Sequence, residues 1–176
     1  MDVLVRPFRE DDAAGLEAAV EASRAHLMPY MPWASEPSQG LEWRRGWLAQ
    51  VIAEEAAGGD RYRGFFDADT GVQVGAGGLH RRVGPRAWEI GYWVHVDWTR
   101  RGIATAAVAA LVAEAFADPE VDAVEIHHDV ANVASARVAQ AAGFTEAGTV
   151  PRTPAAPADT GTDRRWRLER PEPGAG

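Results

Sequence analysis

The sequence lacks two residue types whose side chains carry much of enzyme chemistry. It contains no cysteine, and all 18 of its basic residues are arginine, so lysine is absent as well. Without cysteine there is no thiol nucleophile, disulfide or zinc-thiolate site, and without lysine there is no phosphate-loop lysine and no lysine Schiff base. Any group transfer by this chain must therefore proceed without a cysteine-bound or lysine-bound intermediate.

Long apolar runs are also missing. The best one, residues 106–116, is interrupted by Glu114 and is far shorter than a bilayer span. The start, residues 1–6, carries charge where a secretory signal would be apolar. The 26 acidic residues outnumber the 18 basic ones and give a formal net charge of −8, which argues against affinity for nucleic acid or anionic lipid and favours cationic ligands such as amines. We expect a cytoplasmic protein without nucleic-acid or membrane partners.

A chain of 176 residues suits one hydrophobic core. We expect a single domain over residues 1–170 and a frayed tail over 171–176. Apolar periodicity and turn residues predict a strand at 3–5, a helix that begins at Asp11 or Asp12, and a second helix over 38–57. They then predict strands at 61–67, 72–80 and 87–94, a helix at 103–116, a strand at 123–129, a helix capped by Asn132, and strands at 144–150 and 164–168. This order indicates an α+β fold with a mixed sheet, antiparallel at first and with a βαβ unit late.

The segment 98–105 lies where a predicted strand ends and an amphipathic helix begins. Helix starts bind anions, because the first-turn N–H groups are unpaired and lie at the positive end of the helix dipole. Gly102 would let a phosphate approach the backbone, Ala104 would keep the approach open, and Arg100 and Arg101 would add charge. The alternative is that Gly102 only shapes a turn and that the arginines are solvated.

Four segments in this order and spacing resemble the GCN5-related N-acetyltransferase superfamily, and in particular its branch of ribosomal-protein N-terminal acetyltransferases. They are Glu-Ile-Gly-Tyr-Trp-Val at 89–94, Thr-Arg-Arg-Gly-Ile-Ala at 99–104, Asn-Val-Ala-Ser at 132–135 and Ala-Gly-Phe at 142–144. The family signature Gln/Arg-x-x-Gly-x-Gly/Ala corresponds to 99–104, with Thr99 in place of the usual Gln or Arg. The loop Met-Pro-Tyr-Met-Pro-Trp at 28–33 is also similar to that branch, and the resemblance covers about residues 3–168.

The resemblance implies a mixed, mostly antiparallel sheet of about six or seven strands flanked by helices, splayed between central parallel strands at 87–94 and 123–129. Acetyl-CoA would lie in this splay, with its pyrophosphate on the amides of 100–104 and its pantetheine arm paired with the backbone of 92–96. A strand N–H would polarise the thioester carbonyl, where negative charge grows. The residues implied to bind the cofactor are Tyr92, Val94, Val96, Arg100, Arg101, Gly102, Ile103, Ala104, Thr105, Asn132 and Ser135. A homodimer is the habit of the family.

The resemblance also implies roles for Asn132 and Ser135. In this branch the Asn contacts the pantetheine or an ordered water, and the Ser donates a proton to the departing thiolate. Many members use a Tyr four residues before the Gly-Phe pair as the acid, but Ala139 stands there in this chain, which requires another donor or water. The alternative is that Asn132 is only a helix N-cap and Ser135 an unremarkable helical residue.

An amine must be neutral to attack, so a base is needed. Glu89 is the leading candidate, because it faces away from Ile90 and Tyr92 and lies two residues from Gly91, where a small residue leaves room for substrate. The alternative is a surface carboxylate paired with an Arg. His127 or His128 is the next candidate, and no metal is expected there, because adjacent strand residues point to opposite faces.

In this family the segment that contains Trp33, Trp43 and Trp47 covers the acceptor side, so the resemblance implies a hydrophobic wall for a peptide or amine. We expect Tyr30, Trp33 and Glu89 to contact the substrate. The alternative for all three tryptophans is core packing. His26, His80 and His95 have no partner that the sequence identifies.

These features predict an acetyl-CoA-dependent N-acetyltransferase that moves the acetyl group to a peptide N-terminal amine or a small amine. The absence of cysteine favours direct attack in a ternary complex. A noncatalytic acyl-CoA sensor with the same pocket is the main alternative. A nucleotide-binding regulator that uses only the helix start would leave the segments around Gly91 and Asn132 unexplained.

Overall fold

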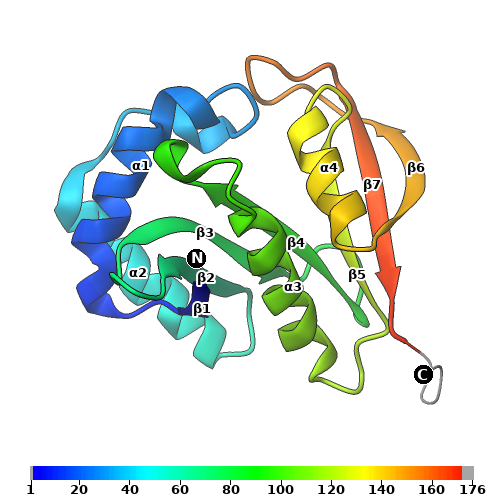
Figure 1. Cartoon of the computed structure of the whole chain (residues 1–176), viewed down its shortest axis with the longest axis horizontal. Coiled ribbons are helices and arrows are strands. Elements are labelled where there is room, and N and C mark those ends of the chain that lie inside the picture. Colours follow the sequence, from blue (N-terminus) through cyan, green and yellow to red (C-terminus); the bar gives the residue numbers. More distant parts are fainter. Residues whose placement is uncertain (1, 172–176) are drawn as a thin grey trace.

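The computed structural model describes residues 2–171 and contains a seven-stranded mixed sheet in the order β1-β2-β3-β4-β5-β7-β6 (Figure 1). The strands are β1 (Val3–Pro7), β2 (Arg61–Asp67), β3 (Gln73–His80), β4 (Ala87–Val94), β5 (Ala123–Asp129), β6 (Thr145–Pro151) and β7 (Thr162–Glu169). The helices are α1 (Ala13–Leu27), α2 (Gly40–Ala56), α3 (Ile103–Phe116) and α4 (Val133–Ala141), with short 3-10 turns η1 (Glu10–Asp12), η2 (Pro32–Ser35) and η3 (Val96–Trp98). The predicted α+β fold with a mixed, mostly antiparallel sheet is confirmed.

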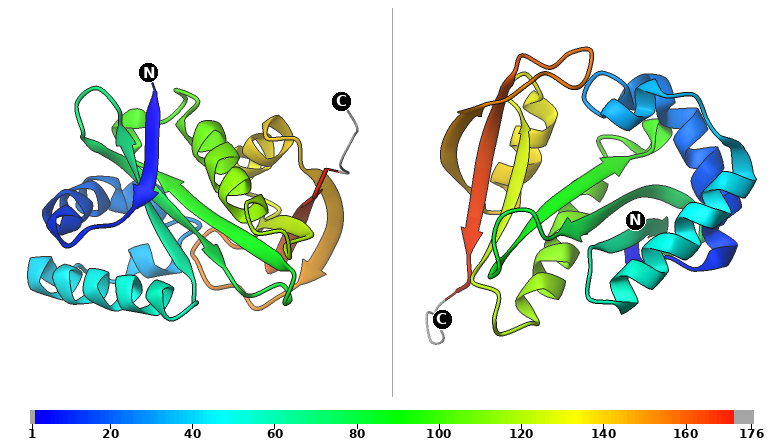
Figure 2. Two further views of the ribbon diagram at one scale, coloured as in Figure 1. Left: turned by 90° about the horizontal axis from the view of Figure 1, so that it is seen from below. Right: turned by 180° about the vertical axis from the view of Figure 1, so that it is seen from behind.

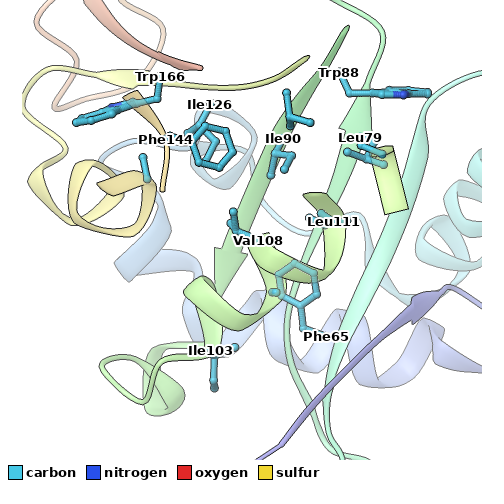
Figure 3. Packing of buried hydrophobic residues seen from close by; sticks show 14 of the residues in the cluster. Phe65, Leu79, Trp88, Ile90, Ile103, Val108, Leu111, Ile126, Phe144 and Trp166 are labelled. Carbon is cyan, nitrogen blue, oxygen red and sulfur yellow. The ribbon is translucent and has the colours of Figure 1, made fainter. Parts of the chain in front are cut away.

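The helices cover the sheet on both faces. Helices α3 and α4 lie on one face, and α1 and α2 pack over β2 and β3 on the other (Figure 2). On the first face, Leu111 of α3 packs with Phe65, Ile90 and Ile126 in the larger core cluster (Figure 3). Full burial of one such side chain contributes about 1.5–3 kcal/mol, so this cluster fixes α3 firmly against β4.

The central strands β4 and β5 run parallel but pair over only three residues. The partners are Ala87↔Ala123, Trp88↔Val124 and Glu89↔Glu125. Beyond Glu89, β4 continues to Val94 paired only with β3, while β5 continues to Asp129 paired with β7. The predicted splay between two central parallel strands is therefore confirmed, and it begins directly after Glu89.

The start of α1 differs from the sequence prediction. Asp12 stands at the N-cap position of α1, but its side chain makes no capping hydrogen bond. The carboxylate instead accepts hydrogen bonds from Arg6 Nη2 at 2.7 Å and from the backbone N–H of Arg9 at 2.7 Å. Asp11 lies inside the 3-10 turn that precedes the helix, so neither aspartate caps α1 through its side chain.

Most of the predicted frayed tail, residues 172–176, lies outside the described residues. Within residues 2–171, none of the helices is both long and apolar enough to span a bilayer.

Candidate active site

The end of β4 and the turn after it carry one end of the candidate site. Three residues here, Tyr92, Val94 and Val96, were predicted to pair with a ligand. The N–H of Val96 donates to Ser23 Oγ at 3.1 Å, and its carbonyl accepts from Thr99 Oγ1 at 3.2 Å. Val96 is therefore engaged within the protein, and Tyr92 and Val94, which border the splay, remain as backbone partners.

The turn into α3 is built from two residues in the left-handed region. Arg100 has a φ of 59° and Gly102 a φ of 79°. Gly102 is the N-cap of α3 and brings no capping side chain, and a Cβ added there would meet nothing within 4 Å. The start of α3 thus has open space beside Gly102 and the exposed Arg100 and Arg101 next to it, and helix starts of this kind bind anions.

Two hydroxyl groups meet across the splay on the α3 and α4 face. The phenol oxygen of Tyr92, on β4, lies 2.8 Å from Ser135 Oγ, on α4. Burial raises the pKa of Tyr92 to about 12, so the phenol keeps its proton and remains a hydrogen-bond donor. Asn132 Oδ1 accepts from the backbone N–H of Ser135 at 3.1 Å, which makes Asn132 the N-cap of α4. Only the main chain of Tyr92 was predicted to contact the ligand; its side chain, which shares a strand face with the buried Ile90, was not.

Glu89 lies on the opposite face of the sheet, at the point where β4 and β5 part. Its Oε1 accepts from Arg82 Nη2 at 3.0 Å, and its Oε2 lies 3.7 Å from His127 Nδ1. His127 Nε2 is 2.6 Å from Glu125 Oε2, and Arg167 Nη1 is 2.6 Å from Glu125 Oε1. Burial opposes ionisation of Glu125, but its hydrogen bonds to His127 and Arg167 lower the pKa of Glu125 below its ordinary value. The splay is thus bordered on this face by two carboxylates and an imidazole, with Glu89 also paired to an arginine.

The second histidine of the pair has a structural role. His128 is buried, its Nδ1 lies 2.7 Å from the carbonyl oxygen of Asp129, and its Nε2 accepts from Trp166 Nε1 at 2.8 Å. Burial lowers the pKa of His128, which keeps the ring neutral as this bonding pattern requires. His128 therefore drops out as a candidate base, and His127 remains. Among the residues that the structure describes, no cluster of His, Asp or Glu could hold a metal ion.

Two loops distant in sequence meet beside the splay. Tyr30 OH donates to the carbonyl of Ala131 at 3.0 Å, and the N–H of Ala158 donates to the carbonyl of Pro29 at 2.9 Å. The buried carboxylate of Asp129 anchors the loop 152–161 by accepting from the backbone N–H of Thr160 at 2.8 Å. The proline-rich loop after α1 is therefore held against the β5–α4 and β6–β7 connections.

The tryptophans predicted for the acceptor side lie in different places. Trp33 is 41% exposed and its ring lies 6.1 Å from that of Trp93, on β4. Trp47 instead packs edge-on against Phe8, in the core under α1 and α2. Trp43 is exposed on α2, beside Arg44. Of these three tryptophans only Trp33 reaches β4 at the splay, while Trp47 is half-buried against the core.

The structure adds a side-chain pair that the sequence analysis missed. His80 Nδ1, at the end of β3, lies 2.8 Å from Asp60 Oδ2, just before β2. In the β3–β4 register His80 pairs with Glu89, and Gly78 pairs with Gly91. A Cβ on Gly91 would lie 3.3 Å from His80 Nε2, so the imidazole lies over the glycine pair. The two partners are 20 residues apart, and only the strand pairing brings them together.

A family model described as "Acetyltransferase (GNAT) domain" matches residues 2–145. Among curated proteins, none matches the sequence. The fold is similar to that of RimL, a ribosomal L7/L12 alpha-N-protein acetyltransferase in complex with coenzyme A (20% identity, 95% of this chain and 93% of that one covered, TM-score 0.85). It is also similar to the ribosomal-protein-S5-alanine acetyltransferase from Vibrio fischeri (19% identity, coverage 98% and 95%, TM-score 0.86). Mycobacterium smegmatis RimJ in complex with a CoA disulfide is 26% identical (coverage 95% and 81%, TM-score 0.79).

Proposed function

Because the chain belongs to the GNAT acetyltransferase family, we propose that it moves the acetyl group of acetyl-CoA to a primary amine, within one domain over residues 1–170. The observation that carries this proposal is the splay after Glu89. It exposes two unpaired strand edges between a hydroxyl pair, Tyr92 and Ser135, on one face and the Glu89 carboxylate on the other. A thioester between these faces would meet proton donors on the side of its sulfur and a proton acceptor on the side of the amine.

Acetyl-CoA fits the turn into α3. The open Cβ direction of Gly102 leaves room for the pyrophosphate on the amides of Ile103, Ala104 and Thr105. Arg100 and Arg101 would pair with further phosphate oxygens. The pantetheine would then follow the edge of β4 at Tyr92 and Val94 towards Asn132. Structural neighbours solved in complex with coenzyme A or acetyl-CoA support acetyl-CoA as the cofactor.

The proposed reaction is a direct attack in a ternary complex, since the chain has no cysteine to carry the acetyl group. The amine lone pair forms a bond to the thioester carbonyl carbon, and the C–S bond breaks with its electron pair on sulfur. The Ser135 hydroxyl donates the proton that makes this sulfur a thiol. Its hydrogen bond to the Tyr92 phenol lets that proton be replaced as it leaves, and solvent restores Tyr92.

Glu89 takes up a proton from the acceptor nitrogen, directly or through a water molecule. Its carboxylate lies on the acceptor face, next to the start of the splay. The ion pair with Arg82 is the observation that favours the alternative function, a noncatalytic acyl-CoA sensor, because it gives Glu89 a structural partner.

The acceptor we propose is the N-terminal amine of a protein or peptide. A small-molecule amine is the alternative acceptor. The neighbours named as ribosomal-protein acetyltransferases support this class. The Trp33 and Tyr30 side chains would provide an aromatic wall for a peptide backbone. We also propose a homodimer, which is common in the family, and dimerisation would leave the acetyl-transfer steps within one chain unchanged.

A screen of peptides and small amines, read out by release of coenzyme A, tests the proposed function. We expect turnover with at least one class of primary amine and none without an acceptor. Binding of acetyl-CoA without acetylation of any acceptor would support the sensor and refute the enzyme.

A further inference from the structure

The Asp60 and His80 pair has no part in the mechanism described so far. We infer that His80 is a catalytic residue, which receives a second proton from the acceptor nitrogen while Glu89 receives the first. This inference rests on the proposed function and adds a residue to the same site.

The reaction removes two protons from the acceptor nitrogen. The acceptor arrives as an ammonium with three N–H bonds and leaves as a secondary amide with one. Its nitrogen therefore loses two protons, one before attack and one as the amide forms. Ser135 gives one proton to the sulfur on the opposite face, so neither proton from nitrogen is taken up there directly. Both protons therefore leave on the acceptor face, and a second side chain there lets the second proton leave before Glu89 has released the first.

The contacts of His80 prepare its Nε2 to be the second acceptor. Asp60 Oδ2 lies 2.8 Å from His80 Nδ1, and Asp60 Oδ1 accepts from the backbone N–H of Arg81 at 2.9 Å. Burial opposes ionisation of Asp60, but the hydrogen bonds from Arg81 and His80 lower the pKa of Asp60 below its ordinary value. A charged carboxylate at Nδ1 holds the proton on that nitrogen and leaves the Nε2 lone pair free to accept.

His80 Nε2 lies over the pair of facing glycines, Gly78 and Gly91. In residues 2–171, His80 Nε2 has no hydrogen-bond partner. A Cβ would lie 3.3 Å from it on Gly91 and 3.4 Å on Gly78, so the two facing glycines supply the space that the imidazole occupies. The side chain is 12% exposed, which leaves a narrow approach. A larger residue at Gly91 would displace this ring.

Glu89 and His80 lie on the same face of the sheet. They are cross-strand partners in the β3–β4 register, so their side chains lie on one face, and Gly91 follows two residues into the splay. In the proposed site, an amine at the edge of the splay beside Gly91 would have both the carboxylate and the imidazole on its face of the sheet.

The other titratable and aromatic groups around His80 leave its Nε2 free to accept a proton. They are Asp60 at Nδ1, the Tyr62 ring with its centroid 5.3 Å away, and Glu89 with its ion partner Arg82. Asp60 already bonds Nδ1, and Glu89 is held by Arg82 on one oxygen. The pH dependence of a variant at His80 therefore has to be read together with that of Glu89.

The test compares His80→Gln and Asp60→Asn with two matched controls. Gln at position 80 keeps a hydrogen-bond donor for Asp60 but is not a base. Asn at position 60 keeps His80 but removes the charged carboxylate that holds the proton on Nδ1. The exposed His26 and Asp69, changed to Gln and Asn, make the same chemical substitutions away from the site. Steady-state kinetics with the best amine from the screen would be measured from pH 6 to 10, with acetyl-CoA affinity by calorimetry.

We expect His80→Gln to lower kcat/KM for the amine by about 10²-fold near neutrality, with recovery at high pH and acetyl-CoA affinity within about twofold of wild type. Asp60→Asn should lie between wild type and His80→Gln, and both controls should match wild type.

An active wild type with His80→Gln within about twofold of it in kcat/KM would overturn the inference alone. So would a parallel loss of turnover and acetyl-CoA affinity, which indicates a structural role. If His80→Gln does not fold, Asp60→Asn decides, and wild-type kinetics in that variant count against the inference. A wild type that acetylates no amine refutes the proposed function and this inference with it.

Discussion

Replacement of Gly102 by Asp and by Asn separates charge from shape at the turn into α3. Gly102 has a φ of 79°, and a Cβ there would meet nothing within 4 Å. Any other residue is strained in this conformation by about 1–2 kcal/mol, and Asn and Asp tolerate it best. Both variants should therefore fold with a similar, small loss of stability, and they differ in a single charge.

The size of the charge effect follows from Coulomb's law. A carboxylate about 5 Å from one phosphate charge, at an effective dielectric constant of about 20, is repelled by about 3 kcal/mol. This corresponds to a loss in affinity of about 10²-fold for one phosphate charge, and added salt would reduce it. We expect Gly102→Asp to bind acetyl-CoA at least about 10²-fold more weakly than Gly102→Asn at low salt.

Calorimetric titration of acetyl-CoA into both variants measures this difference. Gly71→Asn is the matched control, because Gly71 has a φ of 71° in the β2–β3 turn and also has nothing within 4 Å of an added Cβ. It should lose a similar amount of stability and no affinity. Equal affinities of the Gly102→Asp and Gly102→Asn variants would refute the placement of the pyrophosphate at this turn.

Three further predictions concern the splay and its supports. Ser135→Ala should lower kcat while acetyl-CoA affinity stays within a few fold, and Tyr92→Phe should do the same. Because the two hydroxyls act in series, the double variant should be little slower than either single variant. Additive effects in the double-mutant cycle would show independent roles. Glu89→Gln should remove the acidic limb of the pH profile of kcat/KM and lower kcat/KM by about 10²–10⁴-fold near neutrality, with recovery as pH rises towards the pKa of the acceptor amine. An unchanged pH profile would assign Glu89 to its ion pair with Arg82. Burial opposes ionisation of Asp129, but hydrogen bonds from the backbone N–H groups of Ala131 and Thr160 lower the pKa of Asp129. Its contribution to stability is therefore present above the ordinary Asp pKa of about 3.9 and is lost as pH falls through the lower folded-state value. As pH falls below about 4, the Tm of Asp129→Asn should therefore decrease less than the Tm of wild type.

The parts of the fold that the sequence predicts best are those with strong periodicity and clear punctuation. The bounds of β4, α3 and β5 are those predicted, because β4 alternates and follows the Gly84–Pro85 turn, and α3 begins directly after Gly102. The start of α1 was less predictable. The ion pair of Asp12 with Arg6, on β1, outcompetes capping, and a local pattern does not contain that partner.

The site divides in the same way. Ser135 was predicted from the family resemblance and Glu89 from the alternation of its strand beside Gly91, and the structure places them on opposite faces of one splay. The bond of Ser135 to Tyr92 and that of His80 to Asp60 depend on which residues face each other across elements, and local spacing does not specify this. Trp47 shows the converse, since aromatic content alone could not distinguish a core residue from a residue of the acceptor wall.

The short pairing of β4 with β5 has a consequence for local unfolding of the protein. Only three residue pairs join the strands, so the sheet consists of two half-sheets connected near Glu89. Backbone amides that face the gap have no strand partner to slow their exchange with solvent, and the two halves should open as separate cooperative units. A ligand that binds along the exposed edge of β4 and also contacts α4 would join them into one. Amide exchange of β4 beyond Glu89 and of the first turn of α4 should then slow together when acetyl-CoA is added, and unfolding should become more cooperative as well as shift to higher temperature.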